Sequence, residues 1–233
     1  GRPYQNAVNI PFMKSQLTEN LQLYFSLTEK IGKLAAQIAK GRPEAIKIVM
    51  IGKNFEEDLC ERKFDVPFSY QPFTIAGLKG FLGVYIQESV TYINAPYLAK
   101  DRGITVEETK TDQYDKFNDL ILFILKTDKE ELSIAGTVFS DKLGRIVLLD
   151  RFHLDVIPEG TFLHFRIFDR PGIIGKVGTI LGNHRINISG FSVSRQHTGE
   201  EVAFVSVDDP IGEEVLSEIL KIDGMIEAKV IEL

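Results

Sequence analysis

The chain has a single cysteine, Cys60, among its 233 residues, which excludes an intrachain disulfide and a zinc knuckle. It also lacks an apolar run of about 18 residues and an N-terminal signal-peptide pattern, so we expect neither a membrane span nor export. Basic residues do not predominate: 27 Lys and Arg stand against 33 Asp and Glu, a net charge of -6. That balance gives no support to nucleic-acid binding. We expect a cytoplasmic protein with no nucleic-acid or membrane partner.

Motifs of catalysis and cofactor binding are missing as well. There is no His-Glu-x-x-His, no Walker motif and no histidine pair at metal-ligand spacing. Gly172, Gly175 and Gly178 recur every third residue, which does not match the Gly-x-Gly-x-x-Gly of a dinucleotide site. We therefore expect no catalytic residue, no metal and no cofactor in this chain.

Hydrophobic residues make up 44% and charged residues 26% of the chain, which is ordinary for a globular protein. The length suits one large domain or two small ones. We predict a mixed α/β first part with an antiparallel end, from apolar periodicity and turn residues. Helices are expected to begin near Leu17, Ile75 and Asn94. The second runs from Ile75 to Tyr92, with interruptions at Gly77, Gly80 and Gly83. The expected strands are 5–10, 46–51, 104–110, 120–125, 131–139 and 145–149.

A boundary is predicted at Pro158-Glu159-Gly160, dividing the chain into domains 1–157 and 158–233. The second domain follows the order β-α-β-β-α-β of a ferredoxin-like fold, and a turn is expected at His197-Thr198-Gly199. Because a unit of about 75 residues has a marginal core, pairing with a second copy would bury more surface and cover a sheet edge. We expect a homo-oligomer, either a dimer or a tetramer. The predicted elements are strand 162–168, helix 173–183, strand 187–195, strand 202–207, helix 213–221 and strand 225–231.

The segment Asp169-Arg170-Pro171-Gly172 follows a predicted strand and leads into a predicted helix. Proline is tolerated in the first turn of a helix, and the glycine leaves bare backbone there. Free N–H groups at a helix start suit a carboxylate, and an acidic side chain beside them suits an ammonium group. The pattern thus indicates a site for a free amino acid, at an affinity of about -8 to -4 kcal/mol. The alternative is that Asp169 merely caps the helix.

Asn187, followed by Ile188, begins the next predicted strand. In a β-α-β unit, the loops before and after the helix lie at opposite ends of it. Asp169 and Asn187 are therefore expected to meet across two subunits rather than within one.

Three basic residues, Lys142, Arg145 and Arg151, fall in one hairpin-and-strand region. Arg145 and Arg151 are six positions apart, so in one extended strand they would share a face. They are either a solvated surface or an anion site for a phosphate-like ligand. His164 lies within a predicted strand and is expected to be packed, whereas His184 follows a helix end, where a cation is favoured.

The segment Arg166-Ile-Phe-Asp-Arg-Pro-Gly-Ile-Ile-Gly-Lys-Val-Gly, with Arg185-Ile-Asn-Ile-Ser-Gly after it, resembles ACT domains over roughly residues 162–233. ACT domains are ferredoxin-like regulatory modules that commonly bind amino acids at paired interfaces. The runs Asn6-Ala-Val-Asn-Ile-Pro, Val90-Thr-Tyr-Ile-Asn-Ala-Pro and Ile134-Ala-Gly-Thr-Val resemble the intervening domain of the long-form D-3-phosphoglycerate dehydrogenase family. This resemblance implies a mixed α/β intervening domain followed by an ACT domain.

The resemblance also implies a regulatory region without catalytic residues, in which L-serine or another small amino acid lowers the activity of the parent enzyme. NAD would be bound by a catalytic domain outside this chain. Arg145 and Arg151 would match two basic residues of the family's anion site, although a further arginine expected after Arg151 is missing. Two alternatives stay open, the regulatory domains of an iron–sulfur L-serine dehydratase and a stand-alone amino-acid-binding protein. Asp169 and Asn187 match the family's serine-contacting residues, and Gly172 matches its glycine at the helix start. The serine-binding set that we expect is Asp169, Arg170, Pro171, Gly172, Ile173, Asn187 and Ile188.

Overall fold

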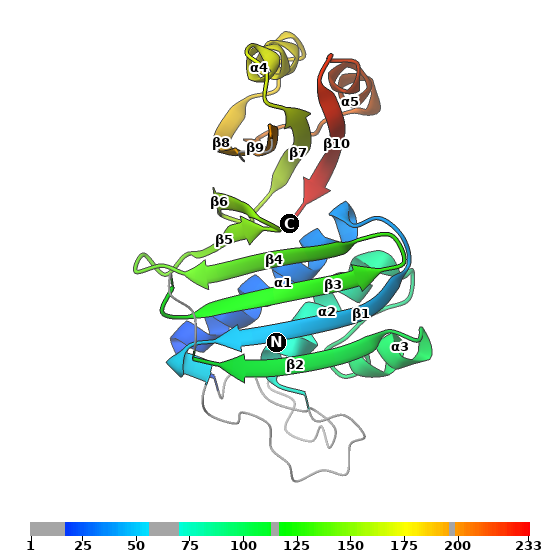
Figure 1. The fold of residues 1–233 in the computed structure, drawn as a ribbon, viewed down its shortest axis with the longest axis vertical. Helices are drawn as coiled ribbons and strands as arrows, with labels where there is room; N and C mark the ends of the chain where they lie inside the picture. The colour runs from blue at the N-terminus through cyan, green and yellow to red at the C-terminus, as the bar shows by residue number, and fades with distance from the viewer. Residues whose placement is uncertain (1–16, 56–69, 113–116, 196–198) are drawn as a thin grey trace. The chain divides into compact units, whose positions relative to one another are not determined.

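The structure, a computed structural model, describes residues 17–55, 70–112, 117–195 and 199–233 (Figure 1). The chain divides into two compact units, Gly1–Arg145 and Ile146–Leu233. The predicted strand 5–10 and most of the predicted turn 197–199 lie outside the described residues. The domain limits 1–157 and 158–233 stay a prediction.

The first unit is a mixed sheet with helices. β1 pairs in parallel with β2 and antiparallel with β3, which in turn pairs antiparallel with β4. The parallel pair is possible because the connection from β1 to β2 is long and includes α2 and α3. The sheet that begins here has the order β2-β1-β3-β4-β5-β6, in which β5 is Gly144–Leu149 and β6 is Phe152–Val156. The predicted mixed α/β part with an antiparallel end is confirmed. Its elements are α1 (Glu19–Ile38), β1 (Pro43–Ile51), the short η2 (Lys53–Phe55), α2 (Pro72–Tyr85), α3 (Ala95–Asp101), β2 (Thr105–Thr111), β3 (Leu120–Thr127) and β4 (Glu131–Val138).

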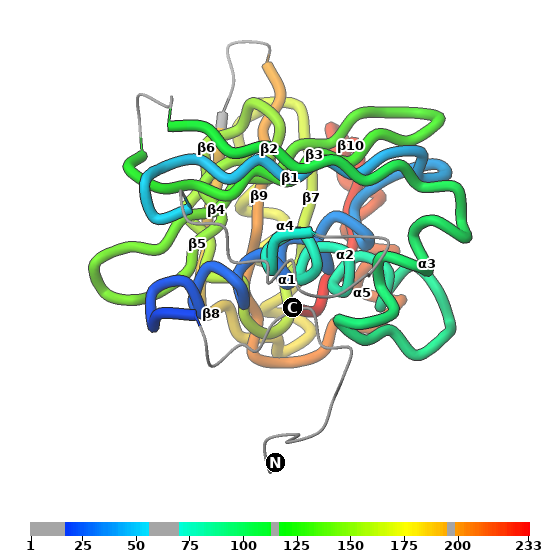
Figure 2. The backbone as a smooth tube through the Cα atoms, turned by 90° about the horizontal axis from the view of Figure 1, so that it is seen from below, coloured from blue at the N-terminus to red at the C-terminus, as the bar shows by residue number. Residues whose placement is uncertain are grey.

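Helix α1 forms as its periodicity predicts. Thr18 begins it, with its hydroxyl accepting from the N–H of Leu21, which satisfies one of the free donors of the first turn. The apolar positions at steps of three and four, from Leu21 to Ile38, are buried. In Figure 2, α1 and α2 lie on the same side of β1, β2 and β3. The core of the first unit therefore lies between one face of the sheet and this pair of helices.

Helix α2 differs from the prediction. It starts at Pro72 and ends at Tyr85, whereas the sequence predicts a helix from Ile75 to Tyr92. The helix continues through Gly77, Gly80 and Gly83. Gly77 and Gly80 permit close packing. A Cβ added at Gly80 would lie 1.9 Å from the carbonyl oxygen of Glu29 on α1. Only glycine allows the two backbones to approach this closely.

The second unit contains an antiparallel sheet in the order β10-β7-β9-β8. Two helices pack on one face of it, where Leu163, Phe165 and Ile167 of β7 meet Val177 of α4 and Ile219 of α5 in one buried cluster. The element order and strand order confirm the ferredoxin-like fold. The elements are β7 (Thr161–Phe168), α4 (Ile173–Asn183), β8 (Ile188–Arg195), β9 (Glu200–Val207), α5 (Glu213–Leu220) and β10 (Met225–Glu232).

Two strands precede this fold in the chain. β5 (Gly144–Leu149) was predicted, but β6 (Phe152–Val156) was not, although its alternation of buried and exposed residues is typical of a strand. A tight turn joins them, in which Asp150 has φ 51°. Because β5 ends at Leu149, Arg145 and Arg151 do not lie on one extended strand. The prediction that they share a strand face is wrong.

Candidate functional site

The loop between β7 and α4 carries the first part of the candidate site. Asp169 is half-buried and donates its backbone N–H to the carbonyl of Gly199 at 2.8 Å, which continues the β7–β9 ladder by one step. Gly172 is the N-cap residue of α4. Its φ of 93° lies in the left-handed region, which favours glycine. Gly172 has no side chain with which to cap α4. The alternative that Asp169 caps the helix stays a prediction.

The start of α4, where the N-cap residue is a glycine, is suited to an anion. The first backbone bond within the helix runs from the N–H of Lys176 to the carbonyl of Gly172 at 3.0 Å. Nothing lies within 4 Å of the position that a Cβ at Gly172 would take. The N–H groups before Lys176 have no partner within the helix, and the helix dipole favours negative charge there. A ligand carboxylate would meet bare amides, with the carboxylate of Asp169 on the same loop.

A second turn holds this loop in place. Phe168 donates its N–H to the carbonyl of Gly224 at 2.9 Å, and Arg170 forms an ion pair with Asp223 at 3.1 Å. Ile173 is 3% exposed and belongs to the buried cluster of this unit. Its side chain is therefore part of the core. Only the backbone of Ile173 remains a candidate for contact with a ligand.

Asn187 lies at the other end of the sheet from Asp169. Its carbonyl accepts from the N–H of Asp208 at 3.2 Å, just beyond the end of β9, whereas Asp169 pairs with Gly199, just before β9 begins. The eight residues of β9 span roughly 27 Å at about 3.4 Å per residue. The structure thus does not bring Asp169 and Asn187 together within one chain.

Sequence reasoning missed two residues that hold Asn187. Its Nδ2 donates to Oδ2 of Asp208 at 2.5 Å, and its backbone N–H donates to Oδ2 of Asp209 at 3.3 Å. Both aspartates follow β9, and the only signal in the sequence is a turn-forming Asp-Asp-Pro run. Their contact with Asn187 depends on the pairing of β8 with β9.

Two of the basic residues proposed for an anion are engaged with carboxylates. Lys142 pairs with Glu19 at 2.8 Å, and Arg145 pairs with Asp141 at 2.6 Å. The guanidinium of Arg145 also lies over the ring of Phe139. An anion would have to compete with the carboxylates of these ion pairs. Lys142 and Glu19 are mostly exposed. The anion site stays a prediction.

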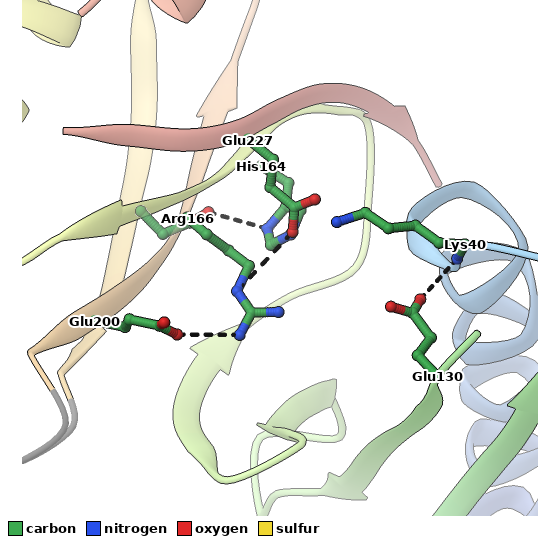
Figure 3. Close-up of polar contacts among 7 residues, drawn as sticks. Lys40, Glu130, His164, Arg166, Glu200 and Glu227 are labelled. Carbon is green, nitrogen blue, oxygen red and sulfur yellow. Dashed lines mark hydrogen bonds and ion pairs between the residues drawn. The ribbon is translucent and has the colours of Figure 1, made fainter. Parts of the chain in front are cut away.

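A polar cluster lies on the sheet face opposite α4 and α5 (Figure 3). Arg166 of β7 reaches Glu200 at 3.4 Å and Glu227 at 3.9 Å, and its guanidinium lies over the ring of Phe152. His164 on the same face is 2% exposed, and its Nδ1 lies 3.3 Å from the carbonyl of Ala203. Burial lowers the pKa of His164 to about 4, against the opposing effect of Glu227. Arg166 offsets part of the negative charge of the two glutamates, and we assign the cluster a structural role.

The strand–glycine–helix segment does not match a dinucleotide site. Both neighbours of β7 in the sheet run antiparallel to it, whereas a dinucleotide-binding unit needs a parallel β-α-β arrangement. Across the described ranges, no three His, Cys, Asp or Glu side chains gather as metal ligands. No helix in the described part of the chain is long and apolar enough to cross a membrane.

Comparison with known proteins matches both parts of the chain. Residues 20–150 match the D-3-phosphoglycerate dehydrogenase intervening domain, and residues 161–224 match the ACT domain. The chain is 34% identical over its whole length to a D-3-phosphoglycerate dehydrogenase of Synechocystis sp., covering 40% of that protein. It is 32% identical to one of Archaeoglobus fulgidus and 30% identical to one of Methanocaldococcus jannaschii, with 100% of this chain and 42% of each relative covered.

The chain therefore spans about two fifths of the length of these relatives. The match to the intervening domain covers more than half of the chain. Its two sheets and its ACT domain agree with that assignment. The chain belongs to the D-3-phosphoglycerate dehydrogenase family, of which it represents the regulatory C-terminal part, an intervening domain followed by an ACT domain.

Proposed function

We propose that this chain senses L-serine for a D-3-phosphoglycerate dehydrogenase, and that two chains form each serine site. The start of α4 beside Asp169, with a glycine as its N-cap residue, carries the proposal. The ligand carboxylate accepts from the free N–H groups of α4, and its ammonium group donates to Asp169 in a charge-assisted hydrogen bond. Arg170, Pro171 and Gly172 shape the loop. Catalysis with NAD belongs, in this proposal, to a domain outside this sequence.

The topology favours one particular pairing of the two chains. β8 is an edge strand of the sheet, and its C-terminal end pairs with the start of β9, the end at which Asp169 lies. If two β8 strands pair antiparallel about a two-fold axis, the start of one lies beside the end of the other. Asn187 of one chain then lies near Asp169 of its partner. Pairing through the other edge, β10, would leave these residues on distant strands.

The spacing suits a small ligand. The distance from β7 to the partner's β8 is three strand spacings, because β9 and β8 lie between them. At roughly 4.8 Å per spacing, this distance is about 14 Å. Two short side chains, two hydrogen bonds of about 2.9 Å and one small zwitterion span such a gap. A large amino acid would not fit between the same anchors.

The surface of β8 supports the same pairing. Phe191 is 41% and Val193 is 38% exposed, and Phe191 packs edge-on against Phe165 of the helix-side core. An edge strand that carries exposed apolar side chains favours association. A second β8 would cover these side chains and pair the free edge at the same time.

Regulation then follows from linkage. Serine bound between two chains stabilises one arrangement of the pair, and it shifts activity only by its difference in affinity between arrangements. A tenfold shift requires about 1.4 kcal/mol, which a few hydrogen bonds supply. The match to the intervening domain favours this parent over an iron–sulfur L-serine dehydratase.

A complementation experiment tests the two-chain site. Asp169→Ala and Asn187→Ala each remove one anchor, so neither variant alone should bind L-serine in calorimetry. Mixed dimers, co-expressed with two different tags and purified on both, hold one site that combines the intact Asp169 of one chain with the intact Asn187 of the other. We expect them to bind serine at about half of the parental stoichiometry.

The outcomes separate the parts of the proposal. A parent protein that binds no L-serine contradicts the ligand, and titrations with glycine and L-alanine then identify another small amino acid. Mixed dimers that bind nothing, while the parent binds, contradict the two-chain site. If either variant binds L-serine as tightly as the parent does, the substituted residue does not belong to the site.

A further inference from the structure

Asn187 is held in one orientation by Asp208. The side-chain Nδ2 of Asn187 donates to Oδ2 of Asp208 at 2.5 Å. An ionised carboxylate accepts hydrogen bonds and cannot donate them, so only the amide nitrogen can face Asp208. The amide oxygen, Oδ1, therefore points away from Asp208, and Asn187 itself is exposed. Asp208 therefore determines that a ligand contacts Oδ1 of Asn187 and not Nδ2.

We propose that Asp208 is a positioning residue, which fixes Asn187 so that its Oδ1 accepts a hydrogen bond from the ligand. This inference rests on the proposed function, because the ligand is the one bound between Asp169 and the partner chain's Asn187. The ligand group at this position must then be a donor, either the ammonium group or a side-chain hydroxyl. A ligand that presents only an acceptor here is rejected.

Charge reinforces this selection. Asp209 accepts from the backbone N–H of Asn187 at 3.3 Å, so two exposed carboxylates lie against this residue. They attract an ammonium group and repel a ligand that carries a further negative charge. The site therefore takes a small amino acid with an uncharged side chain and excludes its phosphorylated form.

Asp208 and Asp209 form a matched pair for the experiment. Asp208→Asn and Asp209→Asn remove the same charge from adjacent positions, but only Asp208 contacts the side-chain amide of Asn187. With Asn at 208, the Asn187 amide can take either orientation, because its new partner both donates and accepts. The full chain is titrated by calorimetry with L-serine, L-alanine, L-glycerate and O-phospho-L-serine.

We expect Asp208→Asn to weaken L-serine binding by about tenfold and Asp209→Asn by less than about threefold, since only the former loses a side-chain orientation. The selectivities identify the donor. If Oδ1 accepts from the hydroxyl, Asp208→Asn loses the preference for serine over alanine. If it accepts from the ammonium group, the variant loses the preference for serine over glycerate. A merely structural role would lower all affinities together.

Equal losses in the two variants, or unchanged selectivity in Asp208→Asn, would overturn the inference. A parent that binds none of the four ligands contradicts the proposed function instead. In that case, nitrogen-15 NMR still decides the orientation. The side-chain amide signal of Asn187, identified by its loss in Asn187→Asp, is expected to shift in Asp208→Asn and to stay in place in Asp209→Asn. An unmoved signal in Asp208→Asn also contradicts the positioning role.

Discussion

Gly80 and Gly83 lie three positions apart on α2 but have opposite surroundings. A Cβ at Gly80 would meet the backbone of Glu29 at 1.9 Å, whereas a Cβ at Gly83 would have nothing within 4 Å. We predict that Gly80→Ala destabilises the protein by roughly 1–3 kcal/mol, because the helices must move apart. Gly83→Ala is expected to stabilise it by about 0.5–1 kcal/mol. Urea unfolding followed by circular dichroism measures both, and equal effects would contradict the packing described here.

His164 gives a prediction for acid stability. Its pKa is lowered from 6.5 to about 4 by burial, so between these values the unfolded chain binds more protons than the folded one. Stability therefore rises with pH across this window and is lost as pH falls through it. At about 1.36 kcal/mol per pKa unit, the contribution is on the order of 3 kcal/mol.

The measurement is a series of urea midpoints from pH 4 to pH 7 for the parent and for His164→Gln. Glutamine keeps a polar side chain of similar reach but does not titrate. The difference between the two proteins is expected to change with pH only in this window. A constant difference would show that His164 does not titrate as described.

Glu108 of β2 takes the place of a side-chain cap on α2. Its Oε2 accepts from the N–H of Gln71 at 3.0 Å and from the hydroxyl of Thr74 at 2.6 Å, and Thr74 is fully buried. Removing this acceptor leaves a buried donor unsatisfied. We predict that Glu108→Ala costs about 1–2 kcal/mol.

Glu107 is the matched control, because it is exposed on the same strand and next to Glu108. Glu107→Ala is expected to change stability by less than about 0.5 kcal/mol. Thermal unfolding of both variants measures the difference. If the two behave alike, Glu108 does not stabilise the start of α2.

Elements with a strong local signal were predictable from sequence. The amphipathic period of α1 and the turn residues around the strands of the ACT domain set their limits to within a few residues. The length of α2 was not predictable in this way, because most of its residues are buried on all sides and no apolar face marks its end. From sequence, the glycines of α2 indicate interruptions of the helix, because the contact of Gly80 with α1 depends on packing that the sequence does not show.

The candidate site was predictable only in part. Asp169 and Gly172 belong to a local motif, and the order of the elements already indicated that Asn187 lies at the opposite end. Asp208 was not found, since its contact with Asn187 depends on the register of two strands. The turn at Asp150, which separates Arg145 from Arg151, was also missed.

The proposed association of two chains gives a prediction that concerns the two sheet edges. Val193→Lys places a charge on the exposed side of β8, and we expect it to dissociate the oligomer while each chain stays folded. Ile226→Lys is the control on β10, where the side chain is 41% exposed, and it should leave the oligomer intact. Analytical ultracentrifugation over a range of concentrations distinguishes them. Dissociation by the β10 variant alone would place the interface on the other edge.

The single strand β9 contacts both halves of the proposed site. The residue before it holds Asp169, and the residues after it hold Asn187. One residue inserted within β9 would displace one half by about 3.4 Å and turn the following side chains to the opposite face. The number of residues in β9 sets the separation of Asp169 and Asn187, which the two paired chains must match. Insertions in this region of related enzymes are therefore expected in the hairpin before β9 and not within the strand.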